Sequence, residues 1–295
     1  MATSNGSFGA GDSYLIEDLI GEELKNIVFK NLLEEVEWNS MRHRGGEVPR
    51  LVAVQGEVAP DLSFPVYRHP SDESPPLTKF TPTVELIRQK VQAAVNHPVN
   101  HALIQRYRSG EDYISEHSDK TIDIVRGSNI VNVSIGAQRN MTLRTKKDRL
   151  GSNPDGQGPS PSATERQKER IPLPHGSMFV MGLETNREWL HTIKQDKRRV
   201  QEKSNEELAF GGERISLTFR HIGTFLTPEE KMIYGQGATG KTREEARPVI
   251  NGSGKEVDAL LDAFGKENRE SDFDWDEWYG KGSDVLHFTK NDSPL

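Results

Sequence analysis

The segment Arg214-Ile-Ser-Leu-Thr-Phe-Arg220 alternates polar and apolar side chains. In a β-strand, side chains two residues apart point to the same face. The two arginines, Ser216 and Thr218 therefore share one face, and the apolar side chains between them share the other. Two guanidinium groups on the inner face of a barrel require anions. The segment predicts a β-rich fold with an interior site for a dicarboxylate; structural salt bridges to inward-facing acids are the alternative.

A second pattern, His117-Ser118-Asp119, places an imidazole and a carboxylate side by side if the segment is extended. Two histidines and one carboxylate can hold Fe(II) on one side and leave three positions for a bidentate co-substrate and O2. His191 is the candidate for the second histidine. When it occurs alone, a His-x-Asp pattern more often lies in a solvated loop than at a metal. A histidine such as His191, taken alone, is more often an ordinary half-buried residue. The charged strand near His191 favours the metal interpretation.

The rest of the chain is consistent with short strands and a few helices. Apolar residues at helical spacing predict helices over residues 22–38 and 83–95. The segments typical of strands are 101–107, 113–119, 129–135, 139–145, 177–181, 191–194 and 214–221. Several short strands in succession favour a barrel or sandwich over a doubly wound sheet. We expect a mainly β fold with flanking helices.

Composition divides the chain into three parts. Residues 1–95 predict a helical and proline-rich extended cover that starts with a loose, polar stretch over residues 1–13. Residues 96–223 predict the core, with a surface loop at 146–170. Residues 224–295 predict a C-terminal extension, whose acidic and aromatic run we expect to pack on the core.

One pattern in the extension is discounted. Gly235-Gln-Gly-Ala-Thr-Gly-Lys-Thr242 matches a phosphate-binding loop, which requires a long helix directly after it. Pro248 interrupts the following segment within a few residues, so we interpret the pattern as a glycine-rich turn.

The overall composition narrows the classes of function. The 295 residues include no cysteine, which excludes disulfides, thiolate zinc sites and cysteine nucleophiles. The formal net charge of −7 argues against a general nucleic-acid-coating role, although local basic patches at 144–149 and 194–199 allow nucleic acid as a partner. Neither a membrane span nor a signal peptide is evident. We expect a cytoplasmic or nuclear monomer that makes no membrane contact.

The motifs of the chain, taken together in their sequence order, resemble the AlkB-like branch of the Fe(II)/2-oxoglutarate dioxygenases, a family with a double-stranded β-helix (jelly-roll) core. The segments that carry the resemblance are Val48-Pro-Arg50, Leu103-Ile-Gln-Arg-Tyr107, His117-Ser-Asp119, Ile130-Val-Asn-Val-Ser-Ile-Gly136, His175-Gly-Ser-Met-Phe-Val-Met181, His191 and Arg214–Arg220. The resemblance implies an enzyme that uses Fe(II), 2-oxoglutarate and O2.

The resemblance also implies roles for single residues. His117, Asp119 and His191 would bind iron. Arg214 and Tyr107 would contact the distal carboxylate of 2-oxoglutarate, and Arg220 would lie near its iron-proximal carboxylate. Gln105 stands where the family usually has an asparagine that contacts the co-substrate.

The substrate is less defined than the chemistry. Members that act on nucleobases typically carry an acid two residues after the metal Asp, where this chain has Thr121. We therefore favour oxidation of a C–H bond in a small amino-acid-like or natural-product metabolite, with release of succinate and CO2. The alternative is oxidative demethylation of N-alkylated nucleobases in DNA or RNA. A further alternative is a non-catalytic binding protein on the same scaffold.

Overall fold

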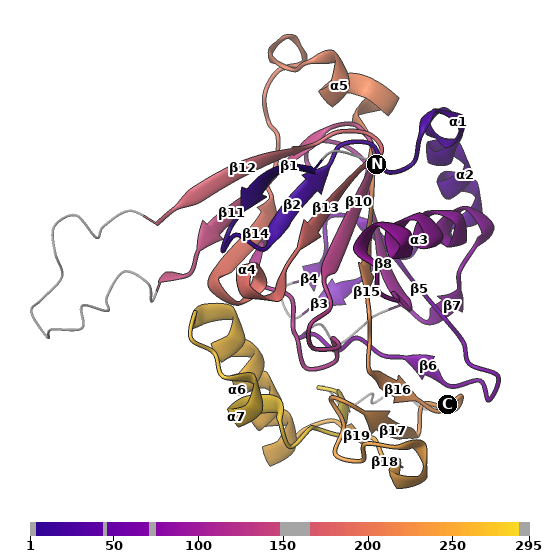
Figure 1. Cartoon of the computed structure of the whole chain (residues 1–295), viewed down its shortest axis with the longest axis vertical. Coiled ribbons are helices and arrows are strands. Elements are labelled where there is room, and N and C mark those ends of the chain that lie inside the picture. The colour runs from indigo at the N-terminus through magenta and orange to yellow at the C-terminus, as the bar shows by residue number, and fades with distance from the viewer. Residues whose placement is uncertain (1–3, 44–45, 71–74, 148–165, 289–295) are drawn as a thin grey trace, which may run out of the picture.

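The computed structural model describes residues 4–43, 46–70, 75–147 and 166–288. Two sheets form its centre (Figure 1). The large sheet runs, in spatial order, β1 (Ser4–Phe8), β2 (Ser13–Ile16), β13 (Ser177–Met181), β10 (Ile130–Gly136), β15 (Arg214–Arg220), β8 (His101–Tyr107), β5 (Leu51–Gly56) and β7 (Leu77–Lys79). The small sheet runs β12 (Lys168–Leu173), β11 (Arg139–Thr145), β14 (Trp189–Ile193) and β9 (Ile114–His117).

The two sheets pack face to face over a shared apolar core. Leu143 and Trp189 from the small sheet meet Ile130 and Phe179 from the large one. The opposite face of the large sheet is covered by helices (Figure 1), which are α1 (Glu22–Lys25), α2 (Val28–Glu35) and α3 (Pro82–Val95). The expectation of a mainly β jelly-roll core with flanking helices is confirmed.

The alternation predicted for β15 is present. Ile215, Leu217 and Phe219 are fully buried in the core beneath the helices. Ser216 and Thr218 face the other way, into a cavity between the two sheets. One strand thus supplies apolar packing on one face and polar groups on the other.

Two local predictions were wrong, and the end of a third was misplaced. The helix expected over residues 22–38 is broken between α1 and α2, because the turn at Asn26 and Ile27 lets the next apolar residues face the sheet while Ile27 stays 50% exposed. The N-terminal stretch is no loose segment: β1 and β2 extend the sheet from β13. Of the loop expected at 146–170, residues 148–165 lie outside the described part, and β12 already begins at Lys168.

The remaining elements lie at the ends of the sheets. A third sheet consists of β18 (Arg247–Pro248), β17 (Met232–Gly235), β16 (Thr224–Leu226) and β6 (Phe64–Pro65). Two-stranded pairs are β3 (Arg42–His43) with β4 (Gly46–Glu47), and β19 (Ile250–Asn251) with β20 (Val285–His287). Further helices are α4 (Leu183–Glu188), η2 (Val200–Glu202), α5 (Asn205–Leu208), η3 (Ala209–Gly212), η4 (Arg243–Glu245), α6 (Lys255–Arg269) and α7 (Trp275–Tyr279).

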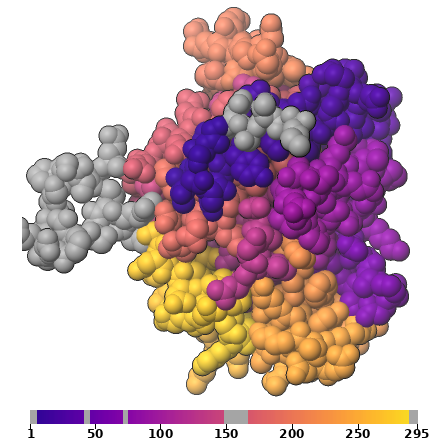
Figure 2. Space-filling view, viewed as in Figure 1, coloured from indigo at the N-terminus to yellow at the C-terminus, as the bar shows by residue number. Residues whose placement is uncertain are grey.

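The C-terminal extension is packed on the core. Figure 2 shows its residues, from orange to yellow, as one continuous surface with the rest of the molecule. Phe264, Phe273 and Tyr279 form an apolar cluster with Ile122 of the core. A buried ion pair joins Arg68 to Asp123 at 2.7 Å, and Nη1 of Arg68 also donates to the carbonyl oxygens of Ser283 and Val285.

The discounted phosphate-loop pattern is a turn. The helix directly after it is the three-residue η4, and Nζ of Lys241 donates to the carbonyl oxygens of Gln236 and Ala238 within the same turn. The long helix that such a loop requires is therefore missing from this place. Separately, no helix in the described part of the chain is long and apolar enough to cross a membrane.

Candidate metal and co-substrate site

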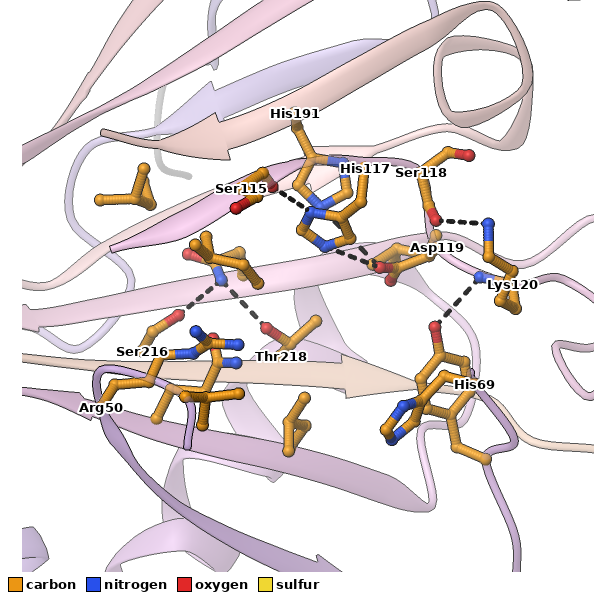
Figure 3. Close-up of a pocket in the computed structure, with 18 of the residues that line it drawn as sticks. Arg50, His69, Ser115, His117, Ser118, Asp119, Lys120, His191, Ser216 and Thr218 are labelled. Carbon is orange, nitrogen blue, oxygen red and sulfur yellow. Dashed lines mark hydrogen bonds and ion pairs between the residues drawn. The ribbon is translucent and has the colours of Figure 1, made fainter. Parts of the chain in front are cut away.

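Two antiparallel strands bring the candidate metal ligands together. His117 at the end of β9 is paired in register with His191 on β14, and Asp119 follows β9 by two residues. One ligand atom from each of the three residues lies within 4.8 Å of the others. In Figure 3 the two imidazoles and the carboxylate converge at the upper side of the cavity. In the described part of the chain, this is the one cluster of its kind.

Hydrogen bonding orients one of the imidazoles. Nδ1 of His117 lies 2.8 Å from the carbonyl oxygen of Ser115, which can only accept, so Nδ1 carries the proton and Nε2 presents its lone pair. Burial and the neighbouring His191 lower the pKa of His117 to about 3, and burial also lowers the pKa of His191. Both rings are therefore neutral near pH 7, as metal ligation requires.

The third ligand is fixed at its backbone and at its carboxylate. The amide side chain of Asn186 accepts from the backbone N–H of Asp119 at 2.8 Å and donates to its carbonyl oxygen at 2.9 Å. Oδ2 of Asp119 accepts from Nη2 of Arg220 at 2.6 Å. The other carboxylate oxygen of Asp119, Oδ1, lies 3.8 Å from Nε2 of each histidine. Two neutral imidazoles and one carboxylate are a donor set that fits Fe(II).

Arg214 is a buried cation without an acid. Its side chain is fully buried, Nε donates to Oγ of Ser134 and Nη2 donates to Oδ1 of Asn132. Nη1 has no partner among the described residues, and no described carboxylate pairs with this guanidinium. Burial lowers the pKa of Arg214 to about 10. A buried guanidinium with a free donor favours a bound anion.

The other residues expected at the co-substrate line a cavity of about 500 Å³. Tyr107, Gln105 and Arg220 all contribute to its wall, and Oε1 of Gln105 accepts from the Tyr107 hydroxyl at 3.3 Å. Arg214 does not itself line the cavity, but its guanidinium lies 5.3 Å from the Tyr107 ring and contacts Asn132, which does. The structure thus gathers all seven predicted residues around one cavity.

Helix α6 closes one side of this cavity, which the sequence did not predict in detail. Leu261, Phe264 and Asn268 line the wall. The backbone N–H of Ser118 donates to Oδ1 of Asn268 at 2.9 Å, and Thr121 donates from its backbone and its hydroxyl to Oε1 of Glu267. The loop that carries Asp119 is therefore held by the C-terminal extension.

Comparison with known proteins agrees with this geometry. The family model described as the 2OG-Fe(II) oxygenase superfamily matches residues 12–220, a range that includes all three candidate ligands and Arg214. The chain belongs to this superfamily. It is an AlkB-like Fe(II)/2-oxoglutarate dioxygenase, and hence an oxidoreductase that uses Fe(II), 2-oxoglutarate and O2. The expectations of family, enzyme class and cofactors are confirmed.

Two groups of relatives support the AlkB-like placement. The DNA oxidative demethylase ALKBH2 of Homo sapiens is 30% identical over 221 residues, which cover 72% of this chain and 74% of that protein. The alpha-ketoglutarate-dependent dioxygenase alkB homolog 3 of Bos taurus is 26% identical over 199 residues, 66% of this chain and 60% of that protein. Among solved structures, OsALKBH1 matches with a TM-score of 0.46 at 13% identity, covering 74% of this chain and 100% of that one.

Proposed function

We propose that this chain is an oxidative demethylase of N-alkylated nucleobases. The observation that carries the proposal is its similarity, across the segment with the candidate ligands, to proteins named DNA oxidative demethylases from human, cattle and mouse. This similarity outweighs the absence of an acid at Thr121. It reverses the preference for a small metabolite that the sequence alone suggested.

In this proposal, His117, Asp119 and His191 hold the iron. Tyr107 and Arg214 bind the distal carboxylate of 2-oxoglutarate, with Gln105 supporting the Tyr107 hydroxyl. Arg220 keeps the Asp119 carboxylate oriented and adds positive charge beside the co-substrate. The free donor on Arg214 and the neutral state of both imidazoles support these roles.

The cavity wall opposite the ligands suits a flat ring. The rings of Tyr67 and His69 lie 5.7 Å apart, and Figure 3 shows His69 across the cavity from His117. Burial and the charge of Arg220 lower the pKa of His69 to about 4, so its ring is neutral near pH 7. Phe264 adds an apolar edge. Stacking of a base on such rings contributes about 1–3 kcal/mol.

The chemistry requires the substrate methyl group to reach the open side of the ligand triad. When bound, the iron and 2-oxoglutarate would supply the oxidising power, with succinate and CO2 as the products of 2-oxoglutarate and the second oxygen atom of O2 delivered to the methyl C–H bond. The resulting N-hydroxymethyl group releases formaldehyde and restores the N–H of the base. The chain positions the methyl group and excludes water from the cavity.

A small-molecule oxygenase is the second candidate, and one observation favours it. Helix α6 and its side chains Leu261 and Phe264 narrow the cavity, which a small metabolite could fill without any groove for a nucleic acid.

A parallel screen distinguishes the demethylase from the small-molecule oxygenase. Succinate and formaldehyde are measured with methylated oligonucleotides and with amino-acid-like metabolites. We expect both products with oligonucleotides, and succinate above background with metabolites alone would favour the second candidate.

The broader organisation is also part of the proposal. We assign residues 96–223 as the catalytic core, with 1–95 and 224–295 as a cover and an extension that complete the cavity from both sides. The partner would be a nucleic acid rather than a metabolite, and the chain would act as a monomer.

A further inference from the structure

The C-terminal helix α6 lies outside the segment that matches the oxygenase superfamily, because that match ends at residue 220. The last turn of α6 nevertheless contacts the loop that carries Asp119, through the side chains of Glu267 and Asn268. The superfamily match therefore assigns no role to these two residues. Their contacts decide what they do.

Glu267 holds the loop on the side that follows Asp119. Its side chain is buried, and Oε1 accepts from the backbone N–H of Thr121 at 2.9 Å and from the Thr121 hydroxyl. Oε2 accepts from the hydroxyl of Tyr279 at 2.7 Å. A further contact comes from α7, where Nε1 of Trp275 donates to the carbonyl oxygen of Thr121 at 3.1 Å. The extension thus fixes both backbone polar groups of Thr121.

Asn268 holds the loop on the side that precedes Asp119. Its Oδ1 accepts from the backbone N–H of Ser118 at 2.9 Å and lies 3.5 Å from the Ser118 hydroxyl oxygen. The candidate ligand therefore stands between two segments of backbone that the extension holds. A carboxylate ligand keeps its direction only while its supports are in place, and loss of such an outer partner typically lowers metal affinity about 10–100-fold.

The end of α6 that makes these contacts is itself anchored. Nζ of Lys146, just after β11, donates to the carbonyl oxygen of Glu267, and Nη1 of Arg187 on α4 donates to that of Ser271. Both are cations at the C-terminal end of a helix, where they also interact favourably with the helix dipole. The acceptors on Glu267 and Asn268 are therefore presented from a fixed position.

Glu267 and Thr121 lie outside the cavity that holds the candidate ligands. Both line a second cavity of about 420 Å³, which shares none of its described lining residues with the first. An effect of Glu267 on a bound metal therefore has to pass through the loop. Direct contact with the metal or with the substrate is not needed for it.

We propose that Glu267 and Asn268 are positioning residues of the metal site, and that the C-terminal extension thereby sets the affinity for the metal. The inference rests on the proposed function through its ligand set, His117, Asp119 and His191. Its consequence appears in metal binding alone, before any substrate is present.

Calorimetric titration of the full chain with Mn²⁺, without 2-oxoglutarate or substrate, measures this affinity. We expect the dissociation constant for Mn²⁺ to rise at least about tenfold in Glu267→Ala and in Asn268→Ala. Glu267→Gln keeps an oxygen acceptor for Thr121 and should stay within about threefold of the unmodified chain. The visible absorption of bound Co²⁺, which reports the coordination geometry, should change in the two Ala variants and stay the same in the Gln variant.

The matched control is Leu260→Ala, which removes a buried side chain from the same helix without removing a hydrogen bond to the loop. It should lower the denaturation midpoint and leave the affinity for Mn²⁺ unchanged. Circular dichroism identifies the folded variants, and Asn268 is only half-buried, so its variant still decides the question if Glu267→Ala does not fold.

Three results would overturn the inference. They are folded Ala variants that bind Mn²⁺ as tightly as the unmodified chain, a loss of affinity in Leu260→Ala equal to theirs, and an equal loss in Glu267→Gln. His191→Ala separates these results from a wrong ligand set. If that variant binds Mn²⁺ like the unmodified chain, the ligand assignment itself fails and the inference fails with it.

Discussion

Oδ2 of Asp119 lies 2.6 Å from Nη2 of Arg220, while Oδ1 of the same carboxylate lies 3.8 Å from Nε2 of His117 and of His191. Burial alone would raise the pKa of Asp119, but the charge of Arg220 holds it well below its usual range. The carboxylate is therefore ionised and oriented before any metal arrives. The arginine at the end of β15 thus holds a candidate metal ligand and also lines the cavity.

The metal assignment predicts that each ligand is essential. Replacing His117, Asp119 or His191 by Ala leaves too few ligands, so we expect more than a tenfold loss of 2-oxoglutarate turnover, or at least about 1.4 kcal/mol in the barrier. Calorimetric titration with Mn²⁺ should show lost binding, and circular dichroism should show a retained fold. Two variants that kept more than about a tenth of the activity would exclude this set of ligands.

Arg214→Lys tests the co-substrate assignment. A lysine keeps the charge but cannot make the two-pronged contact of a guanidinium with a carboxylate. We expect the concentration of 2-oxoglutarate needed for half-maximal turnover to rise at least about tenfold, with metal binding unchanged. Arg106→Lys is the matched control, since Arg106 lies on the neighbouring strand and forms a half-buried pair with Glu213 at 2.8 Å. An unchanged requirement in Arg214→Lys would place 2-oxoglutarate elsewhere.

The anchor of the C-terminal extension should matter for stability. The side chains of Arg68 and Asp123 are 1% and 0% exposed, so Asp123→Asn would leave Arg68 as an uncompensated buried cation. The free energy of unfolding should fall by about 3–5 kcal/mol. Asp276→Asn breaks an exposed pair with Arg126 and should change the free energy of unfolding by less than about 0.5 kcal/mol. Similar denaturation midpoints for the two variants would contradict the anchoring role.

Because α6 forms one wall of the cavity, removing a side chain from that wall should uncouple 2-oxoglutarate turnover from substrate oxidation. Phe264 lines the cavity, whereas Leu260 on the same helix is buried in the same cluster but does not line it. Each change to Ala should destabilise the fold by a few kcal/mol, about 2–5. Only Phe264→Ala should raise the ratio of succinate to formaldehyde, because the enlarged cavity holds the substrate loosely. Equal ratios in the two variants would remove α6 from substrate positioning.

Local sequence patterns sufficed for the parts of the site that lie within single strands. The alternation from Arg214 to Arg220 and the spacing of His117 and Asp119 can be interpreted without any tertiary contact. His191 could be named only as a candidate until the resemblance supported it, because its partner His117 is 74 residues away across the small sheet. The strand prediction for β8 likewise had the bounds that the structure gives.

Contacts between distant segments could not be predicted in this way. Asn186 clamps the backbone of Asp119, and Asn268 and Glu267 hold Ser118 and Thr121, but none of these residues stands in a recognisable motif. An asparagine or glutamate on a helix gives the same local signal whether it is solvated or buried. Only the packing of α4 and α6 against the metal-binding loop distinguishes these cases.

Mass spectrometry can follow oxidative demethylation of a nucleobase by this chain. A single-stranded oligonucleotide with one N3-methylthymine is incubated with the full chain, Fe(II), 2-oxoglutarate and O2, beside the His191→Ala variant. We expect conversion to the unmethylated oligonucleotide, with formaldehyde and succinate formed in equal amounts, and no conversion by the variant. An oligonucleotide that keeps its methyl group while the chain oxidises a small metabolite would contradict it.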